Sequence, residues 1–320
     1  MEFKAIVKNM MSQNVQASGT EYVMVLADLE KEAIGRKVFD SLCELDYSAE
    51  FVVMQTRNRS GEEPPLTVSA AMKASEICFC ICEHSLTHTK ARKDASANGV
   101  KVITMPGITM DMFTEGAMKA DYSNVVKLTE ELTSELTTIN KAVIRTGSEE
   151  QYSLTLQLAG RNGISSTGVF GSTGASGNLP SGESYIAPQI EGSEGQIWID
   201  GSIAGIGKVT EPTLLTVENG RLINATGPAG EKLLSLLGEG DGRYIAEFGI
   251  GTNEAARVTG NILEDEKAFG TIHVAFGSSK TFGGTIDAGV HLDCVTLAPS
   301  VWFEKKQLMK QGNLLEENKS

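Results

Sequence analysis

The sequence predicts an α/β protein in two parts: an N-terminal α/β domain built on a parallel sheet, followed by a strand-rich, glycine-rich α+β domain. Glycine is unevenly distributed, since six of the 34 glycines lie in residues 1–140 and the other 28 in residues 141–320. The hydrophobic pattern changes at the same place, from helical spacing to short strands and turns. A chain of 320 residues also corresponds to about two domains. We therefore predict domains at residues 1–140 and 141–320.

The first domain alternates strands and helices. Short apolar runs at residues 22–27, 51–54, 77–81 and 100–105 are predicted to be strands. The stretches between them have helical character; in residues 34–45, apolar side chains recur every three or four positions. Continuous apolar strands separated by helices are typical of a parallel sheet whose two faces are both covered.

The second domain follows a predicted helix over residues 121–143, in which leucines recur at helical spacing. Residues 152–158 alternate between apolar and polar side chains, as a half-buried strand does. Asn219-Gly220 lies between two apolar runs and predicts a tight hairpin. Leucines at 233–237 mark a short helix.

Composition excludes several classes of protein. With 28 basic and 41 acidic residues the formal charge is −13, which argues against a nucleic-acid partner because phosphate binding needs a cationic surface. There is no apolar run of about 18 residues, so we expect no membrane span. The N-terminus lacks an apolar signal-peptide core, and five cysteines are too few for a disulfide scaffold. A cytoplasmic protein is therefore expected.

His291-Leu292-Asp293 is the sharpest chemical signal in the chain. Residues i and i+2 of a strand point to the same face, so this imidazole and carboxylate would converge on one point. Such a pair suits a divalent metal that takes nitrogen and oxygen ligands. A hydrogen-bonded His–Asp pair at the end of a sheet is the structural alternative.

Three further segments contain polar side chains that the predicted strands and turns do not themselves require. His273 and Glu247 each interrupt an apolar strand, and a buried histidine or glutamate needs a partner or a metal. Glu183 follows a turn fixed by Pro180 and Gly182. If each residue is considered alone, the simplest interpretation of His273 is a buried, hydrogen-bonded core histidine, and that of Glu183 is an exposed turn residue. Together with the His-x-Asp pair they form the ligand inventory of a two-metal hydrolytic site.

These segments, in this order, resemble the M29 metallo-aminopeptidases, the aminopeptidase T group. The match consists of Asn-Leu-Pro-Ser-Gly-Glu at 178–183, Ala-Glu-Phe-Gly-Ile at 246–250, Ile-His-Val-Ala-Phe-Gly at 272–277, and His-Leu-Asp at 291–293. It covers roughly residues 178–300, and the set is more specific than any one piece.

The resemblance implies a cytoplasmic aminopeptidase that acts on small peptides, works as a homodimer and holds two divalent ions per chain, zinc, cobalt or manganese. It also implies a ligand set: Glu183, Glu247, His273, His291 and Asp293. Glu183 or Glu247 would be the general base or the bridging ligand.

Two more residues receive catalytic roles from the resemblance. The family has a tyrosine seven positions after the strand histidine, where this chain has Lys280, which is predicted to stabilise an oxyanion. His88, in Ser-Leu-Thr-His-Thr at 85–89, follows a predicted strand and is expected to act in the substrate pocket as an acid, a base or a binder. The alternative for His88 is a solvent-facing residue at the start of a helix.

Two other functions stay open. The His-x-Asp segment also resembles the 2,5-dihydroxypyridine 5,6-dioxygenases, which share the scaffold and open a pyridine ring with a single Fe(II). Two histidines and one carboxylate are a known iron set. That branch has a histidine where Glu247 aligns, so Glu247 favours the peptidase. The third possibility is a small-molecule or metal-binding protein without turnover.

Overall fold

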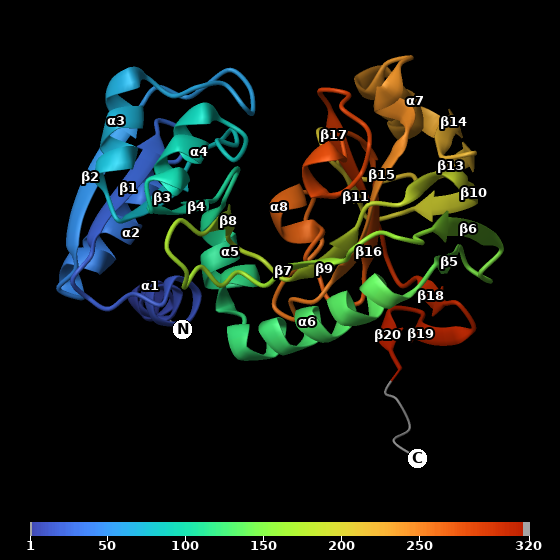
Figure 1. Cartoon of the computed structure of the whole chain (residues 1–320), viewed down its shortest axis with the longest axis horizontal. Helices are drawn as coiled ribbons and strands as arrows, with labels where there is room; N and C mark the ends of the chain where they lie inside the picture. Colours follow the sequence, from blue (N-terminus) through green and yellow to red (C-terminus); the bar gives the residue numbers. More distant parts are fainter. Residues whose placement is uncertain (1, 316–320) are drawn as a thin grey trace. The chain divides into compact units, whose positions relative to one another are not determined.

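The computed structural model describes residues 2–315, which divide into two compact units (Figure 1). Of the described residues, the first unit contains 2–126 and 167–181, and the second contains 127–166 and 182–315. The predicted boundary at residue 140 differs from this division in two places. The chain enters the second unit within a long helix, and it returns to the first unit at 167–181 to add a strand.

The first unit is a parallel five-stranded sheet of order β2-β1-β3-β4-β8. Its strands are β1 (Tyr22–Asp28), β2 (Ser48–Met54), β3 (Ile77–Ile81), β4 (Lys101–Thr104) and β8 (Ser176–Asn178). Its helices are α1 (Phe3–Asn9), a π-helix (Met10–Val15), α2 (Glu32–Glu44), α3 (Leu66–Ala74), α4 (Lys90–Ala97), α5 (Met110–Thr114) and a 3-10 turn (Ala117–Lys119).

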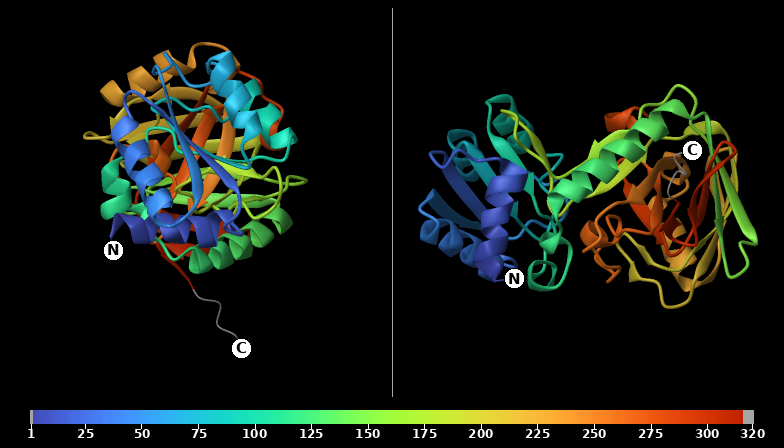
Figure 2. Two further views of the ribbon diagram at one scale, coloured as in Figure 1. Left: turned by 90° about the vertical axis from the view of Figure 1, so that its left-hand side faces the viewer. Right: turned by 90° about the horizontal axis from the view of Figure 1, so that it is seen from below.

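Helices cover both faces of this sheet (Figures 1 and 2). Val68 and Met72 of α3 lie in one apolar cluster with Met24 and Cys78 of the sheet. On the other face Gly35 brings α2 against β1, because a Cβ at Gly35 would lie 2.7 Å from that of Ala27. The predicted α/β class and its four strands are thereby confirmed.

The helix that links the units, α6 (Tyr122–Thr138), is shorter than predicted. We expected it to reach residue 143, but the chain turns at 139–140 and β5 begins at Lys141. Ala142 and Ile144 are buried at alternate positions of β5, so the helical spacing of Val143 with the preceding leucines was coincidental.

The second unit consists of two antiparallel sheets. The eight-stranded sheet has the order β14-β13-β10-β6-β5-β18-β19-β20, and the seven-stranded sheet has the order β12-β11-β17-β16-β15-β9-β7. The first contains β5 (Lys141–Thr146), β6 (Tyr152–Gln157), β10 (Gln189–Ile199), β13 (Thr213–Glu218), β14 (Arg221–Ala225), β18 (Ser300–Phe303), β19 (Lys306–Lys310) and β20 (Asn313–Leu314). The second contains β7 (Ile164–Ser166), β9 (Glu183–Ile186), β11 (Ser202–Ile203), β12 (Gly207–Lys208), β15 (Ile245–Gly251), β16 (Ile272–Gly277) and β17 (His291–Thr296).

One apolar core joins the two sheets. Ile144 and Leu215 of the eight-stranded sheet share it with Phe248, Val274 and Cys294 of the seven-stranded sheet. The helix α7 (Gly227–Leu237) was predicted from its leucines and lies beside β13 and β14 (Figure 1), while α8 (Ile262–Asp265) is a single short turn. These core residues occupy alternate positions of their strands, so the positions between them face away from the core.

The predicted hairpin is confirmed at Asn219-Gly220, which joins β13 to β14. Both residues have positive φ, 45° and 74°, as a two-residue hairpin turn requires. Within residues 2–315, no helix is long and apolar enough to cross a membrane.

Phe248→Ala tests the core between the two sheets. Phe248 is fully buried, so its truncation is expected to lower the free energy of unfolding by about 3–5 kcal/mol in urea denaturation. Phe269, which is 37% exposed, is the matched control, and its alanine variant should lose about 1 kcal/mol or less. Equal losses in the two variants would contradict this packing.

Candidate metal centre

The seven-stranded sheet carries all five predicted metal ligands. They lie on four adjacent strands: Glu183 in β9, Glu247 in β15, His273 in β16, and His291 and Asp293 in β17. Glu247 and Asp293 stand in one row, each paired with Ala275 of β16. Because Phe248 and Cys294, their neighbours along the chain, face the core, the ligands project from the opposite face of the sheet.

The first group of ligands consists of Glu183, Glu247 and His273. His273 Nε2 lies 3.1 Å from Glu247 Oε1 and 3.5 Å from Glu183 Oε2. One ligand atom from each residue falls within 4.8 Å of the other two, and all three residues are buried. Such spacing lets the three atoms share one ion.

The second group consists of Glu247, His291 and Asp293, and its ligand atoms also lie within 4.8 Å of one another. His291 Nε2 is 3.6 Å from Glu247 Oε2 and 3.3 Å from Asp293 Oδ1. The other ring nitrogen, Nδ1, is 2.8 Å from the carbonyl oxygen of Ser278. That contact orients the ring and leaves Nε2 directed at the carboxylates, as in metal-binding histidines.

Glu247 therefore belongs to both groups, with Oε1 facing His273 and Oε2 facing His291. The two candidate groups therefore share one carboxylate, with one oxygen toward each group. Within residues 2–315, Glu183 Oε2 and Asp293 Oδ1 are buried and accept no hydrogen bond. Buried carboxylate oxygens without donors are costly, and divalent cations supply the missing partners. The residues thus fit divalent metal with mixed nitrogen and oxygen ligands.

Gly249 makes room for the His273 ring. The two residues are paired across β15 and β16, and a Cβ at Gly249 would lie 2.1 Å from His273 Nε2. Any side chain at this position would push the imidazole away from Glu247. The glycine that follows Glu247 in the sequence motif is thus explained by the site.

A buried cation that sequence analysis missed also lies here. Lys267 is 1% exposed, and its Nζ is 3.0 Å from Glu183 Oε1 and also contacts Glu266. It holds one oxygen of Glu183 and leaves Oε2 toward His273. Lys267 lies in the turn before the strand of His273. Residues in a turn follow no helical or strand spacing of apolar side chains, so the sequence gives no sign that Lys267 is buried.

Burial and charge act in opposite directions on the histidines. Burial alone would lower the pKa of His273, but the hydrogen bond to Glu247 and the charges of Glu183 and Glu247 raise it to about 9. Burial would likewise lower the pKa of His291, and Asp293 and Glu247 raise it to about 10. Without metal, both imidazoles therefore hold a second proton at neutral pH.

The acids of the site shift in different directions. Burial raises the pKa of Glu247 despite the hydrogen bond from His273. Burial also raises the pKa of Glu266 to about 8, against the lowering effect of Lys267. For Asp293, burial would raise the pKa, but it is outweighed by the charge of His291, which holds this pKa well below the usual range.

Two aromatic residues on this side of the sheet were not anticipated. Tyr185 is two positions after Glu183 in β9, so it projects from the same face. Burial and the charges of Glu247 and Glu183 raise its pKa. The Phe282 ring lies 5.6 Å from the Tyr185 ring and 5.8 Å from the His291 ring, both edge to face. The i, i+2 spacing after Glu183 could have identified Tyr185, whereas nothing in the sequence identifies Phe282.

The structure does not bring Lys280 to these ligands, and His88 belongs to the first unit. Lys280 opens a 3-10 turn, its side chain is 67% exposed, and its Nζ lies 3.4 Å from Asp287. The same turn directs Phe282, not Lys280, against His291. His88 is exposed in the first unit, just before α4, which is capped by Thr89. The catalytic roles of Lys280 and His88 remain predictions.

Comparisons with known proteins agree with the motif resemblance. A sequence model of the family described as thermophilic metalloprotease (M29) matches residues 53–293. The structure is similar to 2,5-dihydroxypyridine dioxygenase from Pseudomonas putida KT2440, with a TM-score of 0.80 and 14% identity over 99% of this chain and 97% of that one. It is also similar to wild-type AmpT from Thermus thermophilus, with a TM-score of 0.69 and 17% identity over 98% and 99%. No curated protein sequence matches the chain. At these identities the two structures establish the fold they share with this chain.

Single ligand variants test the two overlapping groups. Glu183→Gln should weaken one metal site, Asp293→Asn the other, and Glu247→Gln both. We expect each loss to exceed the roughly 10–100-fold typical of an outer-shell partner. Calorimetric metal titration measures it, with Glu194→Gln on the exposed side of β10 as the control. An unchanged second site in Glu247→Gln would contradict the shared carboxylate.

Metal binding is predicted to release protons. The raised pKa values of His273 and His291 mean that both rings are charged at pH 7 without metal, whereas a metal-bound imidazole has lost that proton. About one to two protons should leave per chain at pH 7, and metal affinity should rise as pH increases toward about 9–10. Calorimetry in buffers of different ionisation enthalpy measures the release. A binding enthalpy that is independent of the buffer would refute the prediction.

Proposed function

Since the chain belongs to the thermophilic metalloprotease family M29, we propose that it is a metal-dependent aminopeptidase that releases N-terminal residues from short peptides. The observation that carries the proposal is Glu247, whose two oxygens face two separate ligand groups. A homodimer in the cytoplasm belongs to the same proposal.

Two divalent ions held by these residues would polarise the scissile carbonyl and lower the pKa of an attacking water. Glu183 is the general base in this proposal. Its Oε1 is fixed by Lys267, and its Oε2, which faces His273 in the first ligand group, would bind an ion there and, when released from it, accept the proton of that water. Lys267 is a positioning residue, because it acts on the reaction only through Glu183.

The remaining side chains bind the substrate. The carboxylates on this face attract the free ammonium group of a peptide, which favours cleavage at the N-terminus. Tyr185 is the hydroxyl donor that projects from the ligand face, and we assign it the oxyanion contact for which the sequence suggested Lys280. Phe282 shields His291 from water on one side.

A second function is favoured by the TM-score of 0.80 to the dioxygenase. In that alternative, His273, His291 and Asp293 would hold one Fe(II), and the substrate would be a hydroxylated pyridine. Glu247 argues against it, because its carboxylate belongs to both ligand groups and would be a further ligand beside the two histidines and the aspartate. A protein that binds metal or small molecules without turnover is the third candidate.

The test is amino-acid release from tri-alanine by protein loaded with zinc, cobalt or manganese, followed by chromatography. We expect a chelator to abolish release, and Glu183→Gln at saturating metal to lower kcat by about 100- to 10,000-fold. The exposed Glu194→Gln variant should retain full activity.

Other outcomes would identify the alternatives. One iron per chain with oxygen uptake on 2,5-dihydroxypyridine, and no amino acid released, would replace the peptidase with the oxygenase. Tight binding of two ions with no turnover of either substrate would favour the binding protein.

A further inference from the structure

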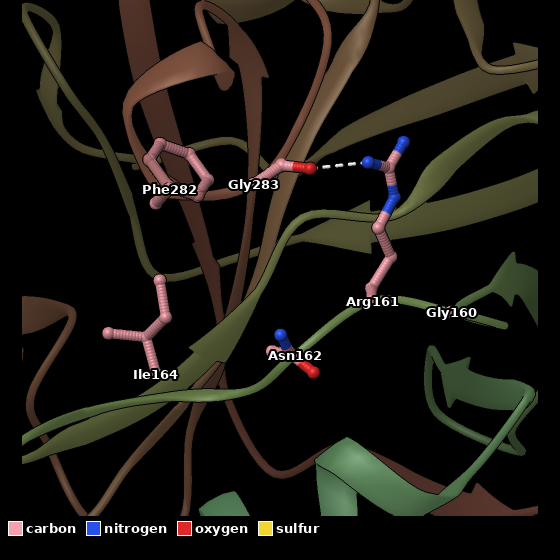
Figure 3. Close-up of a pocket in the computed structure, with 6 residues that line it drawn as sticks. All are labelled: Gly160, Arg161, Asn162, Ile164, Phe282 and Gly283. Carbon is pink, nitrogen blue, oxygen red and sulfur yellow. Dashed lines mark hydrogen bonds between the residues drawn. The ribbon is translucent and has the colours of Figure 1, made fainter.

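A pocket opens beside the metal centre within the second unit. Its volume is about 340 Å³, and its walls come from the loop before β7 and from the turn that contains Phe282. Figure 3 shows Phe282 and Ile164 on one side and the Arg161 side chain reaching Gly283 on the other. The full lining is Gly160, Arg161, Asn162, Ile164, Phe282 and Gly283.

The pocket continues the face of the sheet that bears the ligands. Ile164 of β7 is paired with Tyr185 of β9, and Tyr185 is paired with Gly249 of β15, so one row leads from the pocket to the strand of Glu247. Phe282 forms the pocket wall and also contacts the rings of Tyr185 and His291. A substrate whose first peptide bond lies at the metal centre can extend along this row into the pocket.

Arg161 supplies the only charge in the pocket lining. One of its Nη atoms donates a hydrogen bond to the carbonyl oxygen of Gly283, which fixes the guanidinium at the wall. Among residues 2–315 no carboxylate pairs with Arg161, and its buried Nε has no acceptor. A guanidinium has five donors suited to a carboxylate, so a pocket with an unneutralised arginine is prepared for an anion.

We propose that this pocket binds a carboxylate of the peptide substrate through Arg161. The inference rests on the proposed aminopeptidase function and names the substrate class: short peptides with a negative charge a few residues beyond the scissile bond. Two strand spacings separate β7 from β15, which is about 10 Å. An extended peptide covers about 3.3–3.6 Å per residue, so about three residues span that distance. Tripeptides and tetrapeptides with a free C-terminus meet this requirement, as does an acidic side chain at the same distance.

The experiment compares peptides that differ only in charge. Metal-loaded protein is given tri-alanine as the free acid, tri-alanine amide, and Ala-Ala-Glu amide. We expect the free acid to have the highest kcat/KM, and Arg161→Gln to lower that value about tenfold or more while changing the amide little. Preference for the glutamyl amide over the free acid would identify a side-chain carboxylate as the ligand. Arg145→Gln, an exposed arginine in the same unit, is the control with the same charge change.

A binding measurement separates this inference from the proposed function. The probe is a tri-alanine analogue with a reduced first peptide bond, as acid and as amide, titrated calorimetrically into metal-loaded protein. Tighter binding of the acid that is lost in Arg161→Gln supports the pocket, even if no peptide is hydrolysed. Hydrolysis and binding that are the same for acid and amide, in both wild type and Arg161→Gln, would overturn the pocket and leave the peptidase intact.

Discussion

A buried carboxylate with each oxygen facing a different group of ligands is the constraint from which the rest of this structure follows. Glu247 lies on a strand between neighbours that supply His273 on one side and Glu183 on the other. Three carboxylates within a few ångströms on one buried face would repel one another strongly in the absence of cations. Lys267 compensates part of that charge, and the two histidines compensate more only when protonated. A pair of divalent cations is the compensation that the geometry suits best.

The antiparallel sheet places these side chains on one face. Its pleat turns Phe248, Val274 and Cys294 into the core and presents the residues beside them on the other face. The strand pairing then sets Glu247 and Asp293 in one row. Position 249 must be glycine, because only the absence of a side chain there allows His273 to reach Glu247. The apolar core therefore fixes the positions of the ligands, and a shift of strand register by one residue would remove them from the site.

Patterns confined to one strand could be read from the sequence, and contacts between distant segments could not. His291 and Asp293 were predicted to share a face because alternate residues of any strand do so. Lys267 and Phe282 contact the site from turns, and Arg161 lines the pocket from a loop; the paths of such segments depend on the packing of the whole unit. Residues 167–181 return to pair β8 with β4, a long-range contact that composition does not reveal. The end of α6 was misplaced because Val143 keeps a helical spacing by chance while its neighbours alternate as in a strand.

The most direct test of the shared carboxylate is a crystal structure of the protein soaked with cobalt or zinc, with anomalous scattering recorded at the metal edge. Two peaks are expected, one among Glu183, Glu247 and His273 and the other among Glu247, His291 and Asp293. Glu247 should approach both peaks within about 2.0–2.2 Å. A single peak on the two histidines and Asp293, with Glu247 turned away, would contradict the two-metal account.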